Sequence, residues 1–334
     1  MALSLMSQDT MADVLSFKLF DGHMHPISDD TSKYPQSPQT MPMPGDNGMA
    51  ANQGMTPGGA PAAGAPGGMA SGPQGERIVP DFDKRGLKWL DEEGVAAIAA
   101  VQKRGTYGTD NSYTLDISNE HPDRLRAIVI LDAEKPESVT QLRDMIDKRK
   151  AAGIRLTGSF ATDGSLPWLN SPQARKVWEV ANNAGAVVDL MVTSQDSTAA
   201  VPILIDLAKT YPKVRVVVDH VLSPKAESSD FGINATYAQL AKQRNIYLKY
   251  TIINLDSFDA AKVPTSGFVR KLVDVYGADH VLWGSDAGNS PGTYHELVGR
   301  IVASTEKLTD KEKHQVLHDT GDAVFLRGGK SDTK

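Results

Sequence analysis

Apolar, β-branched runs recur eight times along the chain, and a stretch with helical spacing of its apolar residues follows most of them. Short apolar runs bounded by turn residues are typical of buried strands. The eight runs span residues 16–25, 94–102, 125–131, 153–160, 186–193, 214–220, 245–251 and 280–286. We therefore expect eight strands that alternate with helices.

The intervening stretches carry the end signals of helices. The segments PESVTQLRDMIDKRKAAG (136–153) and SPQARKVWEVANNAG (171–185) begin with Pro or Ser and end on Gly. These residues favour helix starts and stops, respectively. Eight such units predict an α/β fold, a (β/α)8 TIM barrel. A doubly wound open sheet is the alternative, but the glycine-rich turn that usually follows its first strand is not found here.

Residues 36–76 interrupt this pattern with a segment rich in Gly, Pro, Ala and Met that has very few charges. Such a composition buries too little apolar surface to offset the entropy of ordering the chain. We expect a flexible insertion after the first strand of a barrel domain that covers residues 17–326. Residues 1–16 and 327–334 are expected to be terminal tails.

Composition limits the classes of function. The 334 residues carry a net charge of −6 and no Lys/Arg-rich run, which argues against a nucleic-acid partner. Cysteine is absent, so thiolate catalysis, disulfides and cysteine metal sites are excluded. No apolar stretch is long enough to span a membrane, and the N-terminus does not read as a secretory signal. We expect a cytoplasmic protein with no membrane partner, and association into a homo-oligomer stays open.

Four polar residues stand where predicted strands end, which is where the loops of a barrel build its active site. His23 and His25 end the first run, His220 the sixth and Asp286 the eighth. Side chains at i and i+2 of a strand share a face, so the first two imidazoles should converge. Such a pair suits a divalent transition metal or a polarised carbonyl oxygen. A core histidine at 220 and a turn-capping aspartate at 286 are the structural alternatives.

These motifs resemble the amidohydrolase superfamily. DGHMH (21–25), VDH (218–220) and LWGSD (282–286) are similar to its amidohydrolase-2 branch. The segment 101–132 is similar to the lactonase-like group of that branch, which includes 2-pyrone-4,6-dicarboxylate lactonase and sugar-acid lactonases. The resemblance covers nearly all of 17–326 and leaves out the insertion.

The resemblance implies roles for individual residues. Asp286 corresponds to the general base, and His23, His25 and His220 to the groups that stabilise charge on the carbonyl oxygen. Further residues are expected to bind substrate: Gln102 at the end of the second strand, Tyr107, Thr109 and Asn111 in the loop after it, Arg155 in the fourth strand and Asn289. Arg155 would pair with a substrate carboxylate, and a salt bridge inside the barrel is its alternative.

Many amidohydrolases place a metal-binding Lys or His on the fourth or fifth strand, and neither stands at the expected positions here. A two-metal centre is therefore not expected. One Zn²⁺-like ion on His23, His25 and Asp286, or a site without metal, are the two alternatives.

The predicted function is hydrolysis of a lactone, an ester ring, in a small carboxylated substrate by water that Asp286 activates. Decarboxylation of an aromatic or unsaturated acid and isomerisation of a sugar lactone are alternatives within the same branch. A barrel that binds a ligand without chemistry is a further alternative.

Overall fold

The computed structural model describes residues 15–36, 82–193 and 197–326, and its core is a single sheet of eight parallel strands. The strands pair in sequence order from β1 to β8. They are β1 (Leu19–Met24), β2 (Val95–Val101), β3 (Leu125–Ile130), β4 (Gly153–Gly158), β5 (Val187–Val192), β6 (Arg215–Asp219), β7 (Ile246–Thr251) and β8 (Val281–Gly284). Each of the eight predicted runs contains one strand, so the prediction of a (β/α)8 barrel is confirmed.

The sheet curls until β8 lies beside β1. The backbone N–H of Asp286 donates to the carbonyl of His23 at 2.8 Å, and the N–H of His25 donates to the carbonyl of Ala287 at 2.9 Å. Two glycines allow this approach, because a Cβ on Gly22 or Gly284 would collide with the facing strand. The open-sheet alternative is therefore wrong, and the closing bonds lie directly at the predicted site.

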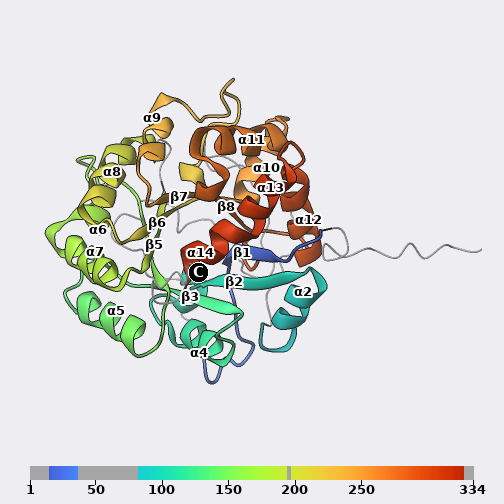
Figure 1. The fold of residues 1–334 in the computed structure, drawn as a ribbon. Helices are drawn as coiled ribbons and strands as arrows, with labels where there is room; N and C mark the ends of the chain where they lie inside the picture. The colour runs from blue at the N-terminus through green and yellow to red at the C-terminus, as the bar shows by residue number, and fades with distance from the viewer. Residues whose placement is uncertain (1–14, 37–81, 194–196, 327–334) are drawn as a thin grey trace, which may run out of the picture.

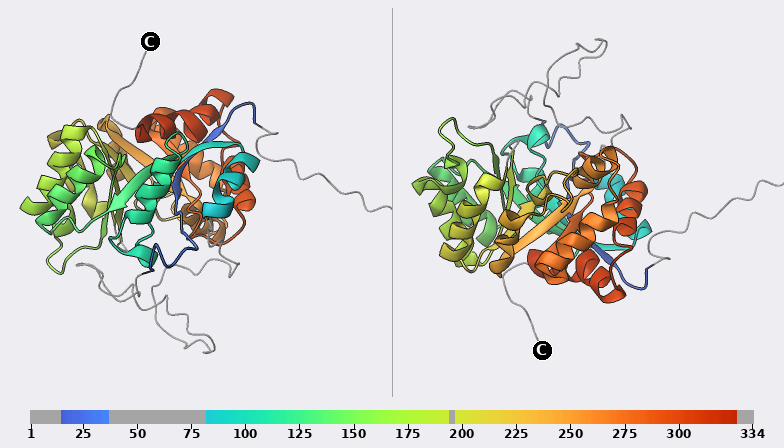
Figure 2. Two further views of the ribbon diagram at one scale, coloured as in Figure 1. Left: turned by 90° about the horizontal axis from the view of Figure 1, so that it is seen from below. Right: turned by 90° about the horizontal axis from the view of Figure 1, so that it is seen from above.

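Helices surround the strands, as Figures 1 and 2 show. The principal ones are α2 (Leu87–Glu92), α4 (Ser112–Glu120), α5 (Glu137–Asp147), α7 (Pro172–Ala184), α8 (Val201–Thr210), α10 (Ile252–Ala260), α11 (Thr265–Tyr276) and α12 (Tyr294–Ser304). The expected end signals are present in α7, where the Ser171 side chain accepts from the Ala174 N–H and Gly185 takes a left-handed conformation at the end. None of the helices among the described residues is long and apolar enough to cross a membrane.

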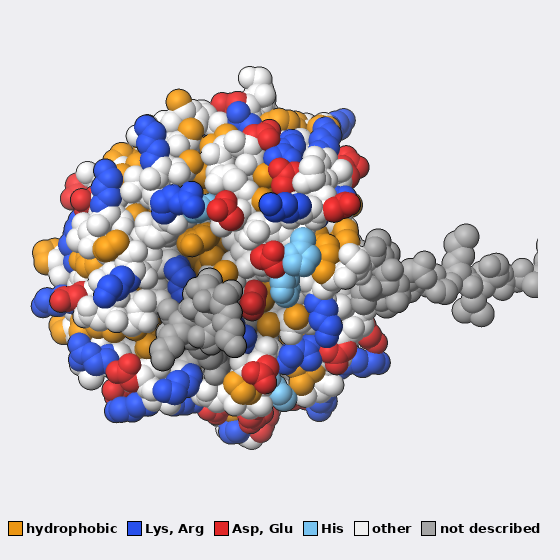
Figure 3. Space-filling model, viewed as in Figure 1, with side chains coloured by type: hydrophobic (Ala, Val, Ile, Leu, Met, Phe, Trp, Pro, Cys, Tyr) orange, Lys and Arg blue, Asp and Glu red, His pale blue; other side chains and the backbone are white. Residues whose placement is uncertain are grey.

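The helix α14 (Thr320–Phe325) crosses the end of the barrel where the strands begin. Its Phe325 stacks on Phe20 of β1 at 5.9 Å between ring centroids. Arg215, the first residue of β6, donates to the backbone carbonyls of Ala323 and Leu326. On this face, acidic and basic side chains are interspersed (Figure 3). The helix closes this end, so access to the interior is left to the opposite end.

The interior of the barrel changes character along its axis. Near α14 it is apolar, with Phe20, Val217 and Leu282 in one buried cluster. Farther from α14, charged side chains line the interior in place of the apolar ones. The imidazoles lie still farther from α14, on the other side of this charged layer. The pairing of β1 with β2 is irregular between Asp21 and Met24, and such a bulge re-aims side chains next to active sites.

The predicted insertion 36–76 and the predicted tails 1–16 and 327–334 lie almost entirely outside the described residues. Their assignment stays a prediction. The described part of the chain accounts for the barrel itself.

Candidate active site

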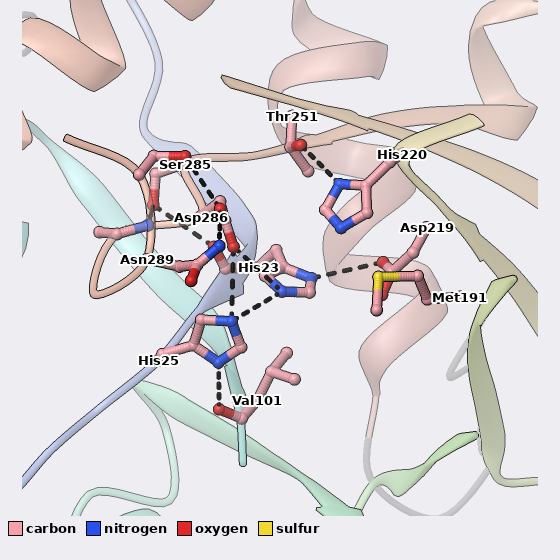
Figure 4. Close-up of polar contacts among 12 residues, drawn as sticks. His23, His25, Val101, Met191, Asp219, His220, Thr251, Ser285, Asp286 and Asn289 are labelled. Carbon is pink, nitrogen blue, oxygen red and sulfur yellow. Dashed lines mark hydrogen bonds and ion pairs between the residues drawn. The ribbon is translucent and has the colours of Figure 1, made fainter. Parts of the chain in front are cut away.

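His23 and His25 meet at the end of β1, as their i, i+2 spacing predicts. Their Nε2 atoms are 3.2 Å apart and their rings are nearly perpendicular (Figure 4). His25 Nδ1 is 2.9 Å from the backbone carbonyl of Val101, and His23 Nδ1 is 3.3 Å from Oδ1 of Asp219. A carbonyl and a carboxylate only accept hydrogen bonds, so these two contacts favour a proton on Nδ1 of each neutral ring. Both Nε2 atoms therefore present lone pairs to the same point.

Asp286 follows β8, and its carboxylate lies close to the Nε2 atoms of both histidines. Its Oδ1 is 3.6 Å from Nε2 of His23 and 3.4 Å from Nε2 of His25. Its Oδ2 accepts from Asn289 Nδ2 and Ser290 Oγ, both at 2.9 Å. Both of these donors are side chains and not the backbone N–H groups that a turn-capping aspartate binds, and the other oxygen faces the imidazoles. The residue has a left-handed φ of 53°, which is rare outside glycine and is common at functional sites.

These three groups have the geometry of a metal-ligand set. Their ligand atoms all lie within 4.8 Å of one another, and all three residues are buried. Two lone pairs and a carboxylate oxygen that face each other repel unless a cation lies between them. His–His–carboxylate ligation with hydrogen-bonded Nδ1 atoms is typical of zinc and related divalent ions. The residues present therefore fit one divalent ion.

The protonation states agree with this arrangement. Burial lowers the pKa of His23 well below its ordinary value and lowers the pKa of His25 to about 4. Burial alone would raise the pKa of Asp286, but the electrostatic effect of the nearby imidazoles of His25 and His23 lowers it below its ordinary range. Near neutral pH the site therefore holds neutral imidazoles and an ionised carboxylate.

His220 lies beside His23, with 5.7 Å between the ring centroids, and does not belong to the ligand set. Its Nδ1 is 2.7 Å from Oγ1 of Thr251, and its other ring nitrogen is turned toward His23 (Figure 4). The backbone from 220 to 223 has four consecutive left-handed φ values of 49–51°. Asn254 Nδ2 donates to the His220 carbonyl at 2.8 Å and helps to fix this unusual turn. The structure thus brings all four predicted chemical groups to one place.

Directly beneath the imidazoles lies a set of four buried charged residues from four consecutive strands: Arg155 (β4), Asp189 (β5), Asp219 (β6) and Lys249 (β7). Arg155 Nε and Nη2 both donate to Asp219 Oδ2 at 2.8 Å, so the salt-bridge alternative describes its contact with the protein. Its role toward a substrate carboxylate stays a prediction. Asp189, Asp219 and Lys249 were not predicted as site residues, although a charged residue inside an apolar strand run was the available signal.

The residues predicted to bind substrate after β2 make contacts within the protein. Gln102 donates to the Asp110 carbonyl and accepts from Thr114. Asn111 binds both the N–H and the carbonyl of Ile130, which ties the loop to the end of β3.

The other two predicted residues of this loop differ in exposure. Tyr107 is buried and accepts from the Ser28 N–H, and Thr109 is exposed. A substrate contact stays a prediction for all four loop residues.

Asn289 lies beside Asp286, and its contact with substrate stays a prediction. Besides donating to Asp286, it accepts from Lys103 Nζ at 2.7 Å through its Oδ1. Lys103 lies two residues after the end of β2, was not predicted, and brings a positive charge close to the candidate base.

A barrel with a His-x-His pair on its first strand and an aspartate after its eighth defines the class of amidohydrolase-like proteins. The family model described as Amidohydrolase, of the amidohydrolase-2 type, matches residues 20–326. The chain belongs to this family, and the resemblance found in its sequence is confirmed.

Three known proteins illustrate the range of the relatives. L-fucono-1,5-lactonase from Burkholderia ambifaria is 25% identical over 217 residues, which cover 63% of this chain and 71% of that protein. A probable 2-pyrone-4,6-dicarboxylic acid hydrolase from Acinetobacter baumannii, with citric acid bound, is 17% identical with a TM-score of 0.60, and the match covers 92% and 99% of the two chains. A 2,6-dihydroxybenzoate decarboxylase from Rhizobium is 14% identical with a TM-score of 0.54, and the match covers 75% and 89%. The two structures show the shared fold.

Proposed function

We propose that this chain hydrolyses the ester bond of a lactone ring in a small carboxylated molecule. The observation that carries the proposal is that the two carboxylate oxygens of Asp286 have different surroundings. Asn289 and Ser290 hold one oxygen, and the other oxygen faces the inner nitrogens of His23 and His25. The similarity to a lactonase over 63% of the chain supports the choice of a lactone over other esters.

Asp286 is the base in this scheme. Its Oδ1, the oxygen that faces the imidazoles, takes a proton from a water molecule. The water oxygen bonds to the lactone carbonyl carbon, and the ring C–O bond breaks. The proton then passes to the departing oxygen. Asn289 and Ser290 keep the carboxylate oriented, so that no reorganisation is needed during the reaction.

The histidines do not have equal roles. His23 and His25 present lone pairs, so neither donates a hydrogen bond to an oxyanion while it is neutral. They would instead hold a divalent ion together with Asp286, and such an ion polarises a carbonyl and lowers the pKa of water. His220, whose free ring nitrogen is turned toward the site, would stabilise negative charge on the carbonyl oxygen. This division favours the one-ion scheme over direct donation by all three histidines.

The carboxylate of the substrate would be bound by basic side chains close to the imidazoles and Asp286. Lys103 lies there beside Asn289, and the Arg155 guanidinium lies beneath the imidazoles. Both carry the charge that a carboxylate needs. This charge supports a carboxylated lactone over a neutral one.

A panel of sugar lactones and carboxylated pyrones tests the proposal. Ring opening is followed by acid release at constant pH, before and after chelation and with zinc restored. Activity that is lost on chelation and regained with zinc supports the one-ion scheme. Release of carbon dioxide without ring opening would assign a decarboxylase, and a rearranged lactone without acid release would assign an isomerase. Tight binding with no turnover of any compound would leave a binding protein.

A further inference from the structure

Lys249 is a buried cation in the middle of β7. Its side chain has no exposed surface, and its Nζ is 2.6 Å from Asp189 Oδ2 and 2.7 Å from Asp219 Oδ1. It also donates to the backbone carbonyl of Gly22 at 3.2 Å. Three oxygen atoms from three different strands therefore surround one ammonium group.

Asp219 connects this ammonium to the site above. Its Oδ1 lies between Lys249 Nζ and Nδ1 of His23, which is 3.3 Å away. Its Oδ2 is held by the Arg155 guanidinium. Two cations thus keep the carboxylate an acceptor, and an acceptor 3.3 Å from Nδ1 of His23 favours a proton on that nitrogen.

The surroundings of Lys249 also resemble a second metal site. His23, Asp189 and Asp219 each offer a ligand atom within 4.8 Å of the others, and all three are buried. The ammonium of Lys249 binds the two carboxylates of this group. The Lys249 ammonium therefore already lies where these three residues could otherwise bind a metal ion.

We propose that Lys249 is a positioning residue, the built-in cation of the His23–Asp189–Asp219 group, which through Asp219 sets the tautomer of His23. With Lys249 in place, His23 keeps its proton on Nδ1 and presents its Nε2 lone pair toward His25 and Asp286. The same ammonium leaves the barrel with one exchangeable ion position instead of two. The inference does not depend on which reaction the site performs.

The alternative is that Lys249 only neutralises two buried carboxylates. Buried ion pairs often contribute little net stability, and removal of one partner is costly whatever its function. A loss of stability in a Lys249 variant would therefore not separate the two explanations. The tautomer of His23 and the affinity of the site for zinc separate them.

The test compares the full-length wild type with Lys249→Met and Asp189→Asn, using chains with ¹⁵N-labelled histidine after chelation. Nitrogen shifts report the tautomer of His23, assigned with a His23→Gln chain. Titration with zinc alone then reports affinity. Asp189→Asn is the matched control, because it alters the other partner of Lys249 and leaves the contact with Asp219 in place.

We expect His23 to carry its proton on Nδ1 in the wild type and in Asp189→Asn, with zinc affinities that agree within about threefold. In Lys249→Met the Nε2–H form should appear, and zinc affinity should fall about 10- to 100-fold, as is typical when an outer-shell partner is lost. The proposal is overturned if folded Lys249→Met keeps the wild-type tautomer and affinity, or if Asp189→Asn shows the same losses. Should Lys249→Met fail to fold, Lys249→Met/Asp189→Asn replaces both partners of this ion pair and is read in the same way.

Discussion

Nε2 of His23 and Nε2 of His25 lie 3.2 Å apart, although the contacts of both rings place the proton on the opposite nitrogen. Two lone pairs at this distance repel, and the nearby Oδ1 of Asp286 adds negative charge. A cation or an added proton among the three groups would relieve this repulsion. Since burial lowers the pKa of both imidazoles, a metal ion fits better than a proton.

Substitutions of His25 and His220 should therefore have different effects on metal binding. His25→Ala removes a ligand, so zinc affinity should fall by more than the roughly 10- to 100-fold that loss of an outer-shell partner costs. His220→Ala should leave zinc affinity nearly unchanged and lower kcat by about 10²- to 10³-fold, the effect of losing one oxyanion donor. Elemental analysis and zinc titration, alongside kinetics, check both. Equal zinc losses in the two variants would contradict this division.

Asp286→Asn should abolish most of the activity with little effect on the fold. The amide oxygen of Asn can still accept from Asn289 and Ser290, whereas an amide cannot take a proton from water. We expect kcat to fall by about 10²- to 10⁴-fold, the usual contribution of a general base. Thermal unfolding provides the control for the fold. Near-normal turnover of the true substrate in a folded variant would show that another group is the base.

The sequence predicted the parts of this protein that depend on periodicity. All eight strands fell within predicted runs, and the i, i+2 spacing placed His23 and His25 on one face. The charged layer beneath them was largely missed, because its members come from four separate strands. Only the closed barrel brings Asp189, Asp219 and Lys249 together.

The loop after β2 shows a second limit of sequence reasoning. Polar residues there are expected to contact substrate, and that stays a prediction. In the structure the side chains of Gln102 and Asn111 form hydrogen bonds with the protein backbone and with Thr114. A polar residue near a site has the same sequence signature whether it binds a ligand or fixes a loop. The one-dimensional pattern holds no signal that separates the two.

His25 should make folding stability depend on pH. Burial lowers the pKa of His25 to about 4, whereas an unfolded histidine titrates near 6.5. Between these two values the unfolded chain binds more protons, so the free energy of unfolding falls as the pH is lowered from about 6.5 to about 4, by up to about 1.4 kcal/mol per pH unit.

The measurement is denaturant unfolding of wild type and His25→Gln across this range, with chelator present. Asp21 acts in the opposite direction, because burial raises its pKa to about 6 and the folded chain binds that proton first. Both proteins contain Asp21, so its effect cancels in the difference. The wild type should lose more stability than the variant on acidification. Parallel curves would mean that His25 is protonated in the folded state or exposed to solvent.

Gly284 should be as sensitive as the catalytic groups, although it has no side chain. A Cβ at this position would meet Cβ of His23 far inside van der Waals contact. In Gly284→Ala, β8 or His23 must therefore shift, at a cost of about 1–3 kcal/mol for overpacking. Because His23 belongs to the ligand set, zinc affinity should fall together with the free energy of unfolding.

Gly299 provides the matched control for this prediction. It lies inside α12, and a Cβ there would meet nothing within 4 Å. Gly299→Ala should raise the free energy of unfolding by about 0.5–1 kcal/mol, because glycine is unfavourable in a helix, and leave zinc binding unchanged. Denaturant unfolding and zinc titration of both variants decide the matter. If Gly284→Ala matched Gly299→Ala in both measurements, the close contact between β1 and β8 would not be what holds His23 in place.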